Sequence, residues 1–134
     1  MKRFVNLALL TFLAACAFAQ PVDSEEMYTK AAALTKLSSA VQAFVRYESV
    51  ADGMTEGEVL RLATKHDAGL LAPFSAYQLR VMRQDRHAIV LMCSADGTRG
   101  LLEDVGCTAR LDKHLWQSPN SEPCEFTLKV SEIC

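Results

Sequence analysis

The sequence has 134 residues, of which 50% are apolar and 22% are charged, and its formal net charge is −2. This length suits one domain and is too short for two full hydrophobic cores. The apolar content excludes an intrinsically disordered chain. The near-neutral charge excludes the strongly basic class of nucleic-acid-binding proteins.

The N-terminal segment has the pattern of a secretory signal peptide. Lys2 and Arg3 precede a mostly apolar run of 12 residues at positions 4–15. A membrane-spanning helix needs about 20 apolar residues, so this run is too short for a permanent anchor. We therefore expect an exported protein of a bacterial envelope, periplasmic or secreted, with no transmembrane span.

One predicted processing site releases a soluble domain. A motif of two alanines, one residue apart, ends at Ala19 and is followed by Gln20, which fits a signal-peptidase site. Cleavage there makes residues 1–19 the signal peptide and residues 20–134 a single domain. It removes two cations and no acid, so the remaining 115 residues carry a net charge of −4.

A second motif indicates a lipoprotein instead. Residues 13–16 resemble a bacterial lipobox, in which Cys16 is acylated after residues 1–15 are removed. The acyl chains would hold the protein on a membrane surface without spanning the membrane. The alternative to a soluble protein is therefore an outer-membrane-anchored lipoprotein.

Two helices are predicted at the start of the exported part. Asp23 or Ser24 is a suitable cap for a helix over residues 24–51, and Thr55 and Glu58 form a capping box for a second, shorter helix. In the first helix, apolar residues recur at spacings of three and four: Leu34, Leu37, Val41 and Phe44. This period places them on one face, which we expect to pack on the rest of the domain.

From residue 77 the apolar residues alternate with polar ones, which is the period of a half-buried strand. The predicted strands lie around 77–82, 87–93, 99–105 and 125–131, with a short helix over 108–116. We therefore predict an α+β fold, in which two N-terminal helices pack on a small antiparallel β-meander of about four strands.

Four cysteines remain once Cys16 is set aside with the N-terminal segment: Cys93, Cys107, Cys124 and Cys134. An even number in an exported chain predicts two disulfides. None of the four forms the close C-x-x-C pair that is typical of redox and zinc sites. We therefore expect both disulfides to stabilise the fold.

Strand geometry ranks the three possible pairings. A strand over 98–105 would separate Cys93 from Cys107 by ~25 Å, whereas bridged Cα atoms lie about 5.5 Å apart. A last strand antiparallel to its neighbour favours the nested pairs Cys93–Cys134 and Cys107–Cys124. The sequential pairs, Cys93–Cys107 and Cys124–Cys134, are the alternative if residues 98–105 form no strand.

The histidines give little indication of a metal or catalytic site. His66, His87 and His114 have no second histidine at a metal-binding spacing. Asp112 and His114 are two residues apart and share a face only on a strand, whereas this segment is predicted to be helical. We therefore expect no metal and no cofactor.

The adjacent acids Glu103 and Asp104 lie within the third predicted strand. Neighbouring side chains point to opposite faces of a strand, so these two cannot form a paired acid–base site. We expect no enzyme activity. A small periplasmic enzyme or ligand carrier, with Asp112, His114 and Trp116 as its best candidates, is the alternative.

Four residues are candidates for contact with a partner. Trp116 is of a type that often anchors protein interfaces. Arg80, Arg83 and Arg86 cluster around the first strand and its turn, where they would bind an anionic group or protect the edge of the strand. We expect a non-enzymatic protein-binding module of the envelope, of the accessory, inhibitor or immunity type. A structural lipoprotein is the alternative if Cys16 is acylated.

Overall fold

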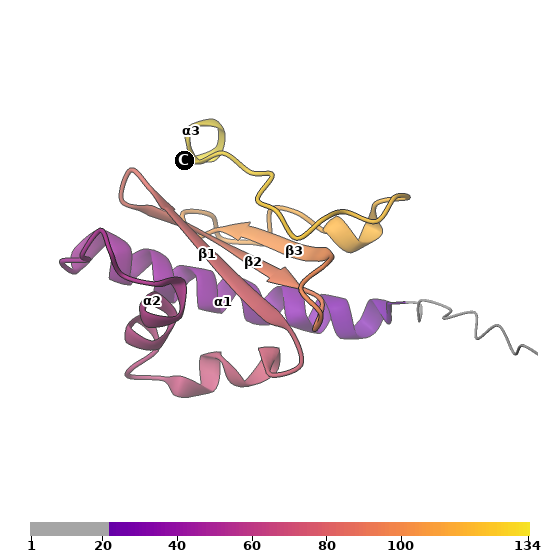
Figure 1. Ribbon diagram of the computed structural model, residues 1–134, viewed down its shortest axis with the longest axis horizontal. Helices are drawn as coiled ribbons and strands as arrows, with labels where there is room; N and C mark the ends of the chain where they lie inside the picture. Colours follow the sequence, from indigo (N-terminus) through magenta and orange to yellow (C-terminus); the bar gives the residue numbers. More distant parts are fainter. Residues whose placement is uncertain (1–21) are drawn as a thin grey trace, which may run out of the picture.

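The computed structural model describes residues 22–134. The predicted signal peptide, its cleavage site and Cys16 lie outside the described residues. Within residues 22–134, no helix combines the length and the apolar character needed to cross a membrane. Figure 1 shows a long helix, α1, lying along a small sheet, with the C-terminal segment on the other side of that sheet.

The long helix α1 spans Ser24–Tyr47. Asp23 is its N-cap, because the Asp23 side chain accepts a hydrogen bond from the backbone N–H of Glu25 at 3.0 Å. The helix ends four residues before the predicted boundary at 51. The predicted apolar face is confirmed, since Leu34, Leu37, Val41 and Phe44 are all buried.

The second helix, α2, spans Glu56–Ala63 and begins at the predicted capping box. The Glu58 backbone N–H donates to the Thr55 hydroxyl at 3.2 Å, and the Glu58 carboxylate accepts from the Thr55 N–H at 2.8 Å. Two short 3₁₀ turns follow, over Ala68–Leu70 and Ala72–Phe74. The second turn places Phe74 in the core and leads into the sheet.

The sheet has three antiparallel strands in the order β1-β2-β3: β1 spans Gln78–Gln84, β2 His87–Cys93 and β3 Gly100–Val105. Asp85 and Arg86, the two residues between β1 and β2, have φ of 52° and 63°. Positive φ at both positions is typical of a tight type I′ hairpin turn. The predicted meander is therefore confirmed for its first three strands.

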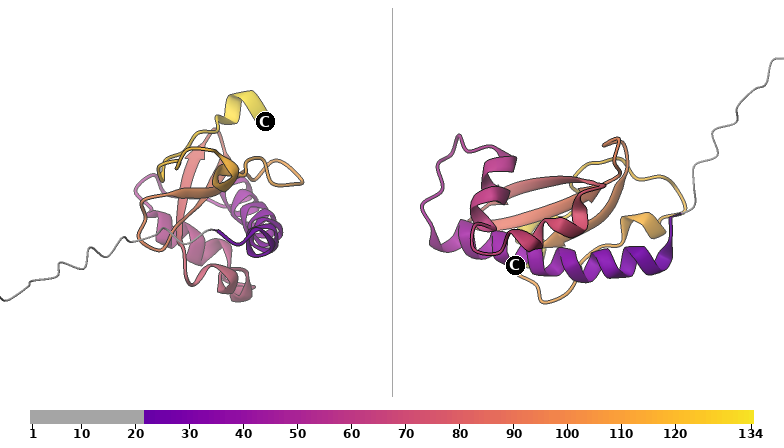
Figure 2. Two further views of the ribbon diagram at one scale, coloured as in Figure 1. Left: turned by 90° about the vertical axis from the view of Figure 1, so that its right-hand side faces the viewer. Right: turned by 90° about the horizontal axis from the view of Figure 1, so that it is seen from below.

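The central strand β2 is covered on both faces. Its residues Ala88, Val90 and Met92 belong to the core formed with α1 and α2. The alternate residues Ile89, Leu91 and Cys93 pack against the C-terminal segment instead. The left view in Figure 2 shows the same three layers, with α1 and the C-terminal segment on opposite sides of the sheet.

The prediction of a fourth strand over 125–131 is wrong. The C-terminal segment, residues 123–134, is irregular as far as the one-turn helix α3, Val130–Ile133. The alternation of apolar and polar residues in this segment still has a structural role, because the apolar residues Phe126, Leu128 and Val130 pack on the face of the sheet. The predicted helix over 108–116 is also wrong, since Lys113 forms a β-bridge with Glu103 and a short 3₁₀ turn, η3, follows over Leu115–Gln117.

Both disulfides are present, but neither predicted pairing is correct. The structure joins Cys93 to Cys124 and Cys107 to Cys134, with Cα–Cα distances of 5.6 and 6.1 Å. The C-terminal segment starts beside the first residues of β3, where Pro123 pairs with Arg99. After this antiparallel bridge it runs in the same direction as β3, since Thr127 contacts Glu103 and Cys134 is bonded to Cys107. The nested pairing required it to run in the opposite direction.

Candidate functional site

Trp116 lies in an aromatic cluster at the N-terminal end of α1. Leu115 anchors η3 in the interior, and the half-buried Trp116 ring contacts Tyr28 edge to face, with 5.8 Å between ring centroids. The His114 ring lies 5.5 Å from the Tyr28 ring and accepts a hydrogen bond from the Trp116 indole N–H at 3.3 Å. Gln117 donates to the Tyr28 hydroxyl at 3.0 Å. Tyr28, 55% exposed, therefore has a fixed orientation.

A shallow groove of about 400 Å³ continues from this cluster along α1. Tyr28, Ala32 and Lys36 are spaced four residues apart, so they lie in one row on the helix surface. Ala32, like the neighbouring Ala31, has a small side chain, which leaves space against Leu111 on the facing loop. We call the groove together with the Tyr28, His114 and Trp116 rings the Tyr28–Trp116 surface.

The Tyr28–Trp116 surface carries positive charge at its edge. Lys36 and Arg110 line the groove, and both are exposed. None of the residues that line it is acidic. The exported part of the sequence is predicted to carry a net charge of −4, so this surface has the opposite sign to the protein as a whole.

The three arginines predicted to contact a partner are bound to the protein itself. Arg80 forms an ion pair with Glu56, with Nε and Oε2 3.1 Å apart, and its guanidinium lies over the Phe126 ring. Arg86 donates to the carbonyl of Arg46 in the last turn of α1. Both arginines therefore connect the sheet to neighbouring elements.

Arg83 holds the loop between the two helices. Its guanidinium donates to the carbonyls of Ala51, Asp52 and Met54 at 3.3–3.4 Å. Arg83 thereby lines a groove of about 660 Å³ between this loop and β1. Arg83 therefore has a structural role, because it fixes the loop between α1 and α2 against β1.

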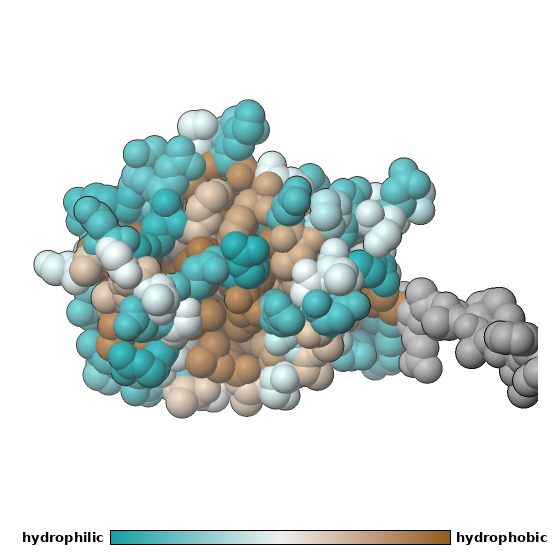
Figure 3. All heavy atoms as spheres, viewed as in Figure 1, coloured by the Kyte–Doolittle hydropathy of each residue, from teal (hydrophilic) through white to brown (hydrophobic). Residues whose placement is uncertain are grey.

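Apolar side chains are exposed in the middle of the face that carries β1, framed by hydrophilic ones (Figure 3). Leu70, Leu71 and Leu79 are partly buried and pack against the main core. They form the margin of that core, where the two 3₁₀ turns meet the sheet. These three side chains therefore extend the main core towards the surface.

The two adjacent acids of β3 point to opposite faces, as predicted. Glu103 pairs in register with Leu91, and Asp104 with Val90. Both carboxyl groups are fully buried. Glu103 faces the C-terminal segment, and Asp104 faces α1, where the Ser38 hydroxyl donates to its carboxyl group.

Asp112 pairs with Asp104, and the Asp112–His114 pair of the alternative enzyme hypothesis is not formed. The Asp112 backbone N–H donates to Asp104 Oδ1 at 3.2 Å. The Asp112 carboxylate accepts from the Val105 N–H at 2.8 Å and from the Thr108 hydroxyl at 2.9 Å. These contacts close the loop after β3.

Burial raises the pKa of Asp104 to about 7. The hydrogen bond from Ser38 opposes this rise, and the neighbouring Asp112 carboxyl adds to it. A second carboxyl group close by makes the charged form of Asp104 less favourable. No local pattern in the sequence indicates this pair, because Asp104 lies in β3 and Asp112 in the loop after it.

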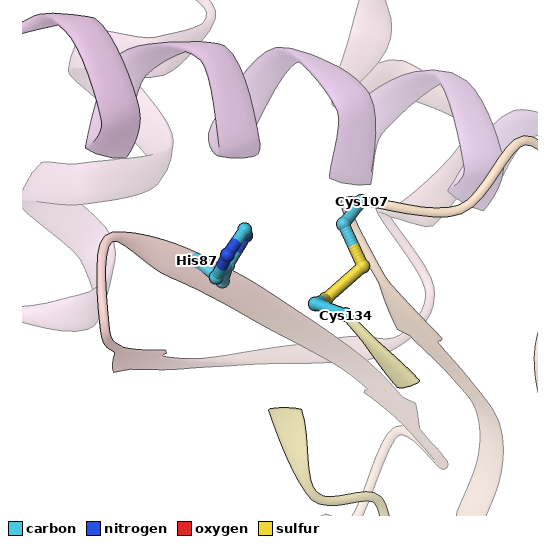
Figure 4. Close-up of side chains that lie close together, drawn as sticks. All are labelled: His87, Cys107 and Cys134. Carbon is cyan, nitrogen blue, oxygen red and sulfur yellow. A yellow bond between two sulfur atoms is a disulfide. The ribbon is translucent and has the colours of Figure 1, made fainter. Parts of the chain in front are cut away.

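His87 lies beside the disulfide Cys107–Cys134 (Figure 4). One ring nitrogen of His87 and the two sulfur atoms all lie within 4.8 Å of one another. Metal ions bind cysteine as a thiolate, whereas here the sulfurs are bonded to each other. The arrangement is therefore an imidazole next to a disulfide. His66, the third histidine, is exposed.

No family model, curated protein or solved structure matches this chain.

Proposed function

We propose that this protein is a non-enzymatic protein-binding module of a bacterial cell envelope, of the accessory, inhibitor or immunity type. The observation that carries the proposal is the Tyr28–Trp116 surface, where aromatic rings fixed by mutual contacts border an apolar groove. Tryptophan and tyrosine are the residues that most often dominate binding energy at protein interfaces.

The chemistry of the groove indicates the kind of partner. Its small and apolar residues fit an apolar segment, and the charges of Lys36 and Arg110 at its edge favour an acidic residue next to that segment. We therefore propose a protein partner that presents an apolar stretch flanked by Asp or Glu.

The envelope location rests on the predicted leader and on the two disulfides. Disulfides persist mainly outside the cytoplasm. Either processing route, release before Gln20 or acylation of Cys16, delivers the domain to that compartment. Fatty-acid labelling of the wild type and of Cys16→Ser distinguishes the routes, because only acylation at Cys16 gives a label that the substitution removes.

The binding proposal is tested by site-specific photocrosslinking in intact envelopes. A photoreactive residue at Ala32 lies in the groove, and the same residue at Tyr47, which is 79% exposed near the other end of α1, is the matched control. We expect a crosslink from position 32 to a partner segment of the stated chemistry, and none to that segment from position 47. Equal crosslinking from both positions would contradict the proposal.

Affinity for the identified partner gives the second measurement. Trp116→Ala is expected to weaken binding at least tenfold, which corresponds to about 1.4 kcal/mol, whereas Tyr47→Ala leaves it unchanged. Higher salt is expected to weaken binding, because the edge of the groove is charged. If neither Trp116→Ala nor Tyr47→Ala changed the affinity, the Tyr28–Trp116 surface would be excluded as the binding site.

A further inference from the structure

The two disulfides differ in their access to solvent. Cys93 is fully buried and packs with Leu91 and Leu115, and its partner Cys124 is half-buried. Cys107 and Cys134 are both exposed. An attacking thiolate must reach a sulfur atom directly, so the Cys107–Cys134 bridge is the more accessible target.

A histidine is held beside the accessible bridge. The carbonyl oxygen of the Gln42 side chain accepts from the Ala88 N–H at 2.9 Å, which fixes the orientation of the amide. The Gln42 amide nitrogen therefore donates to Nδ1 of His87 at 2.7 Å. A neutral imidazole whose Nδ1 accepts carries its proton on Nε2. His87 therefore carries its N–H on Nε2, and one nitrogen of the same ring lies within 4.8 Å of both sulfur atoms.

We propose that Cys107–Cys134 is a thiol–disulfide exchange site whose reaction partner is a dithiol, whereas Cys93–Cys124 is a structural bridge. One thiolate of the dithiol attacks a sulfur of Cys107–Cys134. The bond between the two cysteines breaks, a mixed disulfide forms, and the departing thiolate takes up, from solvent, the proton that the attacking thiol released on ionisation. The second thiol of the dithiol then displaces the remaining cysteine. The dithiol loses two electrons and becomes a disulfide, and Cys107 and Cys134 become thiols.

His87 assists this reaction by stabilising the thiolate that leaves. Hydrogen-bond donation to a thiolate lowers its pKa, and a less basic thiolate leaves faster. With the same sensitivity for the leaving thiolate as for an attacking one, a Brønsted coefficient of about 0.5, a pKa lowered by one unit corresponds to a rate about threefold higher.

The fold tolerates the opening of this bridge. Glu103 accepts hydrogen bonds from Thr127 and Leu128, and Val130 is buried. These contacts hold the C-terminal segment as far as Val130 without the help of Cys134. Reduction is therefore expected to release only the residues after Val130.

Stepwise reduction of the full exported chain tests the proposal. The protein is treated with dithiothreitol for increasing times, its free thiols are alkylated, and each cysteine is located by peptide mass spectrometry. We expect Cys107 and Cys134 to be alkylated at least tenfold faster than Cys93 and Cys124. Equal rates, or faster opening of Cys93–Cys124, would overturn the proposal.

Two sets of variants separate exchange from a purely structural role. Cys107→Ser/Cys134→Ser is expected to keep the near-ultraviolet circular dichroism of the wild type, and loss of that signal would overturn the proposal. His87→Ala is expected to slow the opening of Cys107–Cys134 about threefold, while His66→Ala leaves the rate unchanged. If both histidine variants open at the wild-type rate, the role of His87 is disproved.

Discussion

Glu103 accepts two hydrogen bonds from Thr127, one from its backbone N–H at 2.9 Å and one from its hydroxyl at 2.7 Å. The same carboxylate accepts a third from the Leu128 N–H at 2.9 Å. In a fourth strand, backbone carbonyls of the neighbouring strand would bind these N–H groups. One buried side chain does so here, and it fixes the C-terminal segment to the sheet.

Glu103→Ala is expected to lower the free energy of unfolding by about 3–5 kcal/mol, because it removes the buried carboxylate that accepts three hydrogen bonds from Thr127 and Leu128. Glu103→Gln keeps one carbonyl oxygen and is expected to cost about 1–2 kcal/mol. Urea denaturation measures both values. Glu125→Ala, an exposed acid of the same segment, is the control and is expected to change stability by less than about 0.5 kcal/mol. Equal effects of Glu103→Ala and Glu125→Ala would refute this account.

The pair Asp104–Asp112 predicts a stability that decreases as pH rises. The pKa of Asp104 is about 7 in the folded protein, whereas an aspartate exposed to solvent, as in the unfolded chain, has a pKa of 3.8. The folded state therefore binds more protons than the unfolded state between these values. The contribution of Asp104 to stability is complete below pH 3.8 and is lost as the pH rises through 7.

Asp104→Asn tests this pH dependence. The amide cannot ionise, so the variant is expected to have a flatter profile of urea midpoint against pH between pH 5 and 8 than the wild type. Asp96→Asn is the control, because hydrogen bonds from Ser94 and Thr98 lower the pKa of Asp96 to about 2, far below this range. If the urea midpoint of Asp104→Asn changed with pH as steeply as that of the wild type, Asp104 would be ionised over the whole range from pH 5 to 8.

Gly106→Ala is expected to destabilise the protein by several kcal/mol. A Cβ atom at Gly106 would lie 2.5 Å from Cβ of Gln42 and 2.6 Å from the carbonyl oxygen of Ser38, both on α1. Relief of this overlap requires the helix and β3 to move apart, which disturbs a close-packed core. Gly57→Ala is the control in α2, where nothing lies within 4 Å, and it is expected to stabilise by about 0.5 kcal/mol. Thermal denaturation of both variants measures the difference.

Arg83→Ala is expected to lower the free energy of unfolding by about 1–2 kcal/mol, because the carbonyls of Ala51, Asp52 and Met54 lose a charged donor. Arg83→Lys is expected to recover only part of this loss, since an ammonium group lacks the planar fork of a guanidinium. Partner affinity is expected to stay unchanged in both variants. A loss of affinity without a loss of stability would instead place Arg83 in a binding surface.

Local signals were sufficient to predict the first two thirds of the fold. The cap at Asp23, the capping box at Thr55 and the strands as far as Val105 depend on neighbours within a few residues. The C-terminal segment depends on Glu103, which is 24 residues away from Thr127. Alternating apolar residues fit either a strand or an irregular segment that lies on a sheet face. The prediction of an antiparallel strand over 125–131 therefore led to the wrong disulfide pairing.

The candidate binding surface was predicted in part. Trp116 was identified from its residue type, but its contact with Tyr28 joins residues 88 positions apart in sequence. Tyr28 lies outside the apolar row formed by Leu34, Leu37, Val41 and Phe44. A large aromatic residue on the polar face of a helix was the signal that could have identified it.

The two disulfides interleave along the sequence, since each closes a loop that contains one cysteine of the other. A single proteolytic cut anywhere between Cys93 and Cys134 therefore leaves at least one bridge across the cut. The exposed stretch 119–121 is the kind of loop that proteases attack. With both bridges intact, a nicked molecule would stay in one covalent piece, with its C-terminal segment still attached.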